Sequence, residues 1–122
     1  MQENSEQGRD QTVQSGNVTR DLADVPAIEV VSTAAVHLMS AAAVHLGLAE
    51  DLDDHRDLDE ARTLIEALAG LITASTANLG HHHAAPLRDG LKTLQLAFRE
   101  ASPIPDAPGE GPGEKFTGPV YS

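Results

Sequence analysis

The chain has 122 residues, a formal net charge of -11 and no cysteine, which suits one small domain with polar ends better than two domains. The lack of cysteine excludes disulfides, thiolate metal sites and a cysteine nucleophile. With 19 acidic residues against 8 basic ones, the chain should repel a phosphate backbone, so we expect no nucleic-acid binding.

The N-terminal residues 1–23 are polar and rich in Gln, Glu, Asp and Gly, without sustained apolar periodicity. This composition predicts a disordered arm. The first ten residues, MQENSEQGRD, contain no basic stretch leading into an apolar one, so we expect no secretory signal and a cytoplasmic protein.

The first predicted helix begins near Pro26, with Asp24 as its cap, and ends at Gly47 or Leu48. Residues 30–48 carry no formal charge and are long enough to span a membrane. However, the run contains serine, threonine and two histidines, and its borders are acidic without a lysine or an aromatic anchor. We therefore expect a soluble helix and no membrane association.

This helix is apolar on most sides, and two further helices of the same chain cannot cover all of it. Self-association would cover the rest, because small residues allow helices to approach closely. The sequence predicts a homodimer, with Ala35 and Ala42 as candidate self-association residues.

The tetrapeptide Ala-Val-His-Leu occurs twice in this helix, and its two histidines raise the question of a metal site. On a helix, His37 and His45 are separated by a rise of about 12 Å, too far for one ion. The favoured interpretation is that both histidines have structural roles at a partly buried helix interface. We expect no bound metal and no cofactor, with a histidine-based metal- or ligand-binding protein as the alternative.

The second predicted helix begins at Asp57, whose carboxylate should cap it, and ends near Gly80. The third runs from Ala84 or Pro86 to Ala101, and a turn containing His81–His83 precedes it. Leucines and a phenylalanine at helical spacing predict a buried stripe on the third helix: Leu87, Leu91, Leu94 and Phe98. The fold class is therefore all-α, an antiparallel three-helix bundle over residues 24–101.

Residues 102–122 hold five of the seven prolines, which predicts a disordered tail that no helix can cross. Three large side chains near its end, Phe116, Val120 and Tyr121, are unusual for such a tail. They are candidate partner-binding residues. Either the tail folds back onto its own bundle or it orders on a protein partner, and the sequence slightly favours the partner.

No nucleophile elbow, phosphate-binding loop or cluster of acids in an apolar run is present in the sequence, so we predict no catalytic residues and no enzymatic activity. An acidic helical module that docks an unidentified protein partner is the favoured function.

The segments PAIEVVSTAAVHLMSAAAVHLGL, DLDEARTLIEALAGLITASTANLG and HHAAPLRDGLKTLQLAFREAS, followed by PGEGPGEKFTGPV, carry a family resemblance. Together they resemble actinobacterial members of the domain of unknown function 1844 family. The resemblance implies a small, soluble, helical protein with no established activity, cofactor or catalytic residues. The family is associated with gene neighbourhoods of translation initiation factor three, so the resemblance also implies a translation-associated partner.

Overall fold

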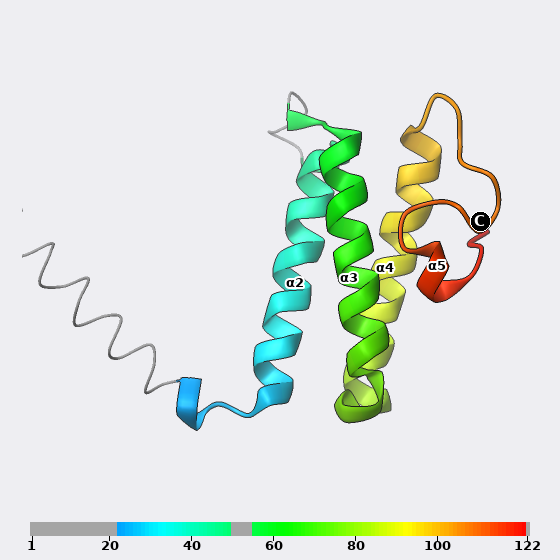
Figure 1. The fold of residues 1–122 in the computed structure, drawn as a ribbon. Coiled ribbons are helices and arrows are strands. Elements are labelled where there is room, and N and C mark those ends of the chain that lie inside the picture. Colours follow the sequence, from blue (N-terminus) through cyan, green and yellow to red (C-terminus); the bar gives the residue numbers. More distant parts are fainter. Residues whose placement is uncertain (1–21, 50–54, 122) are drawn as a thin grey trace, which may run out of the picture. The chain divides into compact units, whose positions relative to one another are not determined.

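The computed structural model describes residues 22–49 and 55–121. The chain divides into two compact units, Met1–Val30 and Val31–Ser122, and the features below belong to the second. Its helices, apart from the first residues of α2, are α2 (Ala27–His45), α3 (Leu58–Leu79), α4 (His81–Ala101) and the short α5 (Glu114–Thr117) (Figure 1). The described ranges contain no strand, and the predicted all-α three-helix bundle is confirmed. The predicted arm, 1–23, lies outside the described residues except for its last two.

Helix α2 contacts the rest of its unit through Met39 and through its C-terminal end. The backbone N–H of Asp57 donates to the carbonyl of His45 (2.8 Å), and Nδ1 of the His45 ring donates to the carbonyl of His55 (3.0 Å). Met39 lies against Gly90 of α4, where an added Cβ would require the end of the Met39 side chain to shift. By length and composition alone, α2 could cross a membrane, with a mean hydropathy of 1.6 over a window that is 11% buried.

Helix α3 begins as the sequence predicts. The Asp57 carboxylate accepts hydrogen bonds from the backbone N–H groups of Asp59 (3.1 Å) and Glu60 (3.2 Å), which caps the first turn. One stripe of α3 is buried, and its residues are Ala61, Ile65, Leu68, Ala69, Ile72 and Leu79.

Helix α4 begins earlier than the sequence predicts, at His81, because Gly80 alone reverses the chain with a φ of +79°. His81–His83 therefore form the first turn of α4 and not a preceding loop. Pro86 lies inside α4, in its second turn, where its missing N–H removes one hydrogen bond of the helix. The predicted stripe of Leu87, Leu91, Leu94 and Phe98 is buried, so α3 and α4 pack as an antiparallel pair (Figure 1).

Candidate functional site

Residues 102–121, here called the C-terminal segment, fold back onto α3 and α4 (Figure 1). The sequence predicted a disordered tail there, and this prediction is wrong for the described residues. The segment includes a helical turn, α5, between Gly113 and Gly118, and the prolines lie outside that turn. Pro112, Glu114 and Val120 are buried. Of the two alternatives for the tail, the structure shows the one in which it covers its own bundle.

Arg99 of α4 holds the first half of the C-terminal segment. Its Nη1 donates to the carbonyl of Asp106 (2.9 Å), and its Nη2 lies 3.3 Å from both carboxylate oxygens of Glu114. The Glu114 side chain is 0% exposed, and it also accepts from the backbone N–H of Gly109 (3.0 Å). Arg99 therefore compensates the buried negative charge of Glu114, which would be costly to remove from water without a partner.

A second ion pair ties the same stretch to α3. Nη2 of Arg62 lies 2.9 Å from Oδ2 of Asp106, and the Arg62 guanidinium stacks over the Phe98 ring at 4.9 Å from its centroid. Asp106 and the chain around it are thereby fixed to α3 by Arg62 and to α4 by Arg99.

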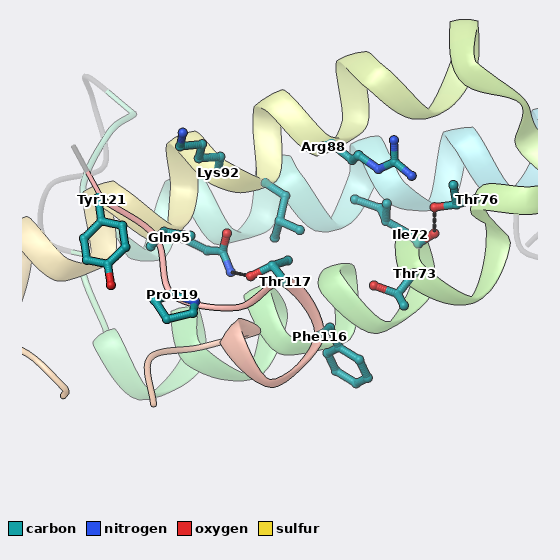
Figure 2. A pocket seen from close by; sticks show the side chains of 12 residues that line it. Ile72, Thr73, Thr76, Arg88, Lys92, Gln95, Phe116, Thr117, Pro119 and Tyr121 are labelled. Atoms are coloured by element: carbon teal, nitrogen blue, oxygen red, sulfur yellow. Dashed lines mark hydrogen bonds between the residues drawn. The ribbon is translucent and has the colours of Figure 1, made fainter. Parts of the chain in front are cut away.

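Gln95 of α4 holds the second half of the segment. Its Nε2 donates to the carbonyl of Pro112 (3.1 Å) and to the hydroxyl of Thr117 (3.2 Å), as Figure 2 shows for the latter. Gln95 is buried within an otherwise apolar stripe, so these two bonds are what allow a primary amide at that position.

The C-terminal segment forms one wall of a pocket of about 560 Å³, here called the α3–α4 pocket. Its volume lies in the range typical of ligand sites. Three elements line it (Figure 2): α3 with Ile72, Thr73 and Thr76; α4 with Arg88, Leu91, Lys92 and Gln95; and the segment with Phe116, Thr117, Pro119, Val120 and Tyr121. Apolar side chains, hydroxyls and two cations therefore meet there, whereas none of the lining residues that the structure describes carries a carboxylate or an imidazole.

The three candidate partner-binding residues all lie on this wall. Val120 is buried, whereas Phe116 is 43% exposed and Tyr121 is 68% exposed. The Phe116 ring lies over Gly70 of α3, where a Cβ would sit 3.3 Å from it. Their role in binding a partner stays a prediction, but the structure gathers them at one site.

The candidate self-association residues Ala35 and Ala42 do not lie on a free surface. Both are fully buried within the single chain, so a second copy cannot contact them in this fold. The prediction for these two residues is wrong, because the rest of the single chain already covers both side chains. The exposed side of α2 carries other residues, among them Ala34, Val36 and Ser40.

The histidines are not brought together into a metal site. Among the residues that the structure describes, no group of three or more His, Asp or Glu side chains could hold an ion. His37 is exposed on α2, and His81–His83 are exposed on the first turn of α4. The alternative of a histidine-based metal site therefore gains no support from the described geometry.

Sequence reasoning did not single out several residues that build the pocket. Arg88 and Lys92 were not singled out as binding residues, and the roles of Gln95, Arg99 and Glu114 in holding the segment that forms one wall of the pocket were not foreseen. The one signal available was Gln95, a polar residue set within the spacing of the apolar stripe of α4.

The fold and the pocket define a class: a small three-helix bundle whose C-terminal segment encloses a site lined by apolar, hydroxyl and cationic groups. The family model described as Domain of unknown function (DUF1844) matches residues 27–100, and the chain belongs to this family. Comparison with curated proteins and with solved structures gave no match. The family match ends where α4 ends, before the C-terminal segment.

Proposed function

We propose that this chain is a non-catalytic interaction protein that binds a segment of a protein partner in the α3–α4 pocket. The observation that carries the proposal is the gathering of exposed aromatic side chains there. The chain has two phenylalanines, one tyrosine and no tryptophan. Phe98 is in the core, and the other two aromatic residues, Phe116 and Tyr121, both line the pocket. Exposed aromatic residues beside a cation are enriched at protein interfaces and supply much of their binding energy.

The chemistry of the lining supports binding over catalysis. General acid–base catalysis usually relies on an imidazole or a carboxylate, and nucleophilic catalysis on a group activated by such a base. In 22–49 and 55–121, the part of the chain that the structure describes, no imidazole or carboxylate side chain lines the α3–α4 pocket. A cytoplasmic location is part of the same proposal.

Capture from a lysate of the source organism tests this function. The full chain and the variant with Phe116→Ala and Tyr121→Ala are immobilised side by side, and bound proteins are identified by mass spectrometry. Ile104→Ala is the matched control, because Ile104 is an exposed large side chain of the same segment that does not line the pocket. We expect at least one protein that wild type and I104A retain and the double variant loses. Identical capture by all three would contradict the proposal.

We further propose that the exposed face of α2 joins two copies of the chain. Its only Asp, Glu, Lys or Arg is Glu29, in its first turn, whereas the chain carries a net charge of -11. Two copies repel one another over most of their surface, so an uncharged face is where they can approach. Val36 lies on this face and is 52% exposed.

Light scattering at micromolar concentration should therefore give twice the 12.8 kDa of one chain. Val36→Glu should give the mass of one chain without loss of helicity, because this side chain is exposed. Thr63→Glu places the same charge on an exposed site of α3 and should leave the dimer intact. A monomeric wild type, or co-sedimentation of wild type with lipid vesicles through α2, would contradict this proposal.

A further inference from the structure

The free positive charge of the described chain is concentrated at the α3–α4 pocket. Three arginines bind the chain itself: Arg56 donates to the carbonyl of Ala101 (3.1 Å), Arg62 pairs with Asp106, and Arg99 pairs with Glu114. Arg88 and Lys92, which line the pocket, form no ion pair with any residue that the structure describes. Lys115 lies next to Phe116, with its Nζ 5.3 Å from the ring centroid.

This distribution gives the pocket a positive local charge, opposite in sign to the net charge of the chain. A chain with 19 acidic and 8 basic residues would be expected to place a carboxylate near each surface cation. Among the described residues, no carboxylate side chain lines the pocket, although Asp89 is the neighbour of Arg88 on α4. Unpaired cations beside a partly desolvated apolar floor attract anionic groups more strongly than cations on an open surface do.

The spacing of the two cations limits the shape of what they can bind. Residues four apart on a helix lie on the same side, about 6 Å apart along its axis. Two carboxylates at about that separation occur at every second residue of an extended peptide or four residues apart on a helix. The apolar part of the lining comes from Ile72 of α3, Leu91 of α4 and Val120 of the segment, and one apolar side chain of a ligand can pack against it.

We infer that the α3–α4 pocket recognises an acidic peptide segment of its partner, with two carboxylates facing Arg88 and Lys92 and one apolar side chain between Leu91 and Val120. This inference rests on the proposed function and adds the chemistry of the partner. The aromatic pair at the rim supports a peptide occupant, because Phe116 and Tyr121 can cover a chain that passes over the pocket. Binding should weaken as salt is added, since both cations are exposed.

A random peptide library displayed on phage, selected on the immobilised full chain, tests the inference. We expect enrichment of peptides that combine Asp or Glu with one large apolar residue. The enrichment should disappear on the variant with Arg88→Gln and Lys92→Gln, and should persist on Asp89→Asn, which changes a charge of α4 that does not line the pocket.

A selected peptide is then synthesised with a fluorescent label, together with its isostere in which Gln and Asn replace Glu and Asp. Fluorescence anisotropy should give about tenfold weaker binding for the isostere, the effect expected from two partly exposed charge pairs. The R88Q/K92Q variant should bind the two peptides equally well.

The outcomes separate this inference from the proposed function. Selected peptides that lack acidic residues but require Phe116 and Tyr121 would overturn the inference and leave the proposed function standing. Equal selection on wild type and on the F116A/Y121A variant would overturn both. Binding of dodecanoate in this pocket, without any selected peptide, would assign the site to a small carboxylic amphiphile and likewise overturn the inference.

Discussion

Replacing Gly113 with alanine should release the C-terminal segment from α3 and α4 and lower the Tm by several degrees. Gly113 has a φ of +76°, and an added Cβ would sit 2.8 Å from Cβ of Ala69 and 3.1 Å from Nε2 of Gln95. The Cβ of Ala69 is fixed to the α3 backbone, and two hydrogen bonds hold the Gln95 amide, so neither group can move away easily. Backbone strain and overpacking together should cost about 2–4 kcal/mol.

Gly109→Ala is the matched control for this experiment. Gly109 has a φ of +86° in a turn that the N–H of Glu110 closes onto the carbonyl of Ala107 (2.9 Å), so alanine is strained there as at Gly113, but the added Cβ would meet only Cγ of Pro119, at an ordinary contact distance of 3.8 Å. Strain alone should cost about 1–2 kcal/mol. Thermal unfolding followed by circular dichroism compares the two variants. Equal losses for both would show that Gly113 does not touch α3 and that the segment is not seated as described.

Glu114→Ala should be the second strongly destabilising change. It removes the carboxylate that pairs with Arg99 and leaves the backbone N–H of Gly109 without its acceptor. The side chain of Arg99 is only 20% exposed, so its charge would be poorly solvated in the variant. Breaking a buried pair in this way typically costs about 3–5 kcal/mol. Denaturant unfolding of the full chain measures the loss.

Two further variants isolate the ion pair from other effects of the substitution. Glu110→Ala removes an exposed carboxylate from the same segment and should change stability by less than about 0.5 kcal/mol. Adding Arg99→Met to Glu114→Ala should cost less than the sum of the two single changes, because the second change removes an already unpaired charge. Equal effects of E114A and E110A would contradict the buried pair.

The bundle was predictable because its determinants are local. Asp57 caps α3 through amides two and three residues away, and the stripe from Leu87 to Phe98 follows directly from helical periodicity. Local patterns also predicted that large side chains at the end of the chain require an explanation. They could not say whether Ala35 and Ala42 face another helix of the same chain or a second copy, because both arrangements need the same small residues.

The C-terminal segment was not predictable because its determinants are distant in sequence. Proline and glycine forbid regular structure, and in the sequence this is hard to distinguish from disorder. What fixes the segment is a set of side chains on α3 and α4, chiefly Arg62, Gln95 and Arg99, that bond its carbonyl and carboxylate groups. The pocket depends on the same distant contacts, so Arg88 and Lys92 gained their position only in the folded chain.

The folding of the C-terminal segment onto α3 and α4 is the claim on which the pocket depends, and amide hydrogen exchange of the full chain tests it most directly. Three of the hydrogen-bonded backbone N–H groups of the segment serve as probes: Gly118 donates to the carbonyl of Glu114 (2.7 Å), Phe116 to that of Gly113 (2.9 Å), and Gly109 to the carboxylate of Glu114 (3.0 Å). We predict that these amides exchange at least about 100-fold more slowly than in an unstructured peptide. Exchange of all three at the unstructured rate, with α4 still protected, would contradict the account.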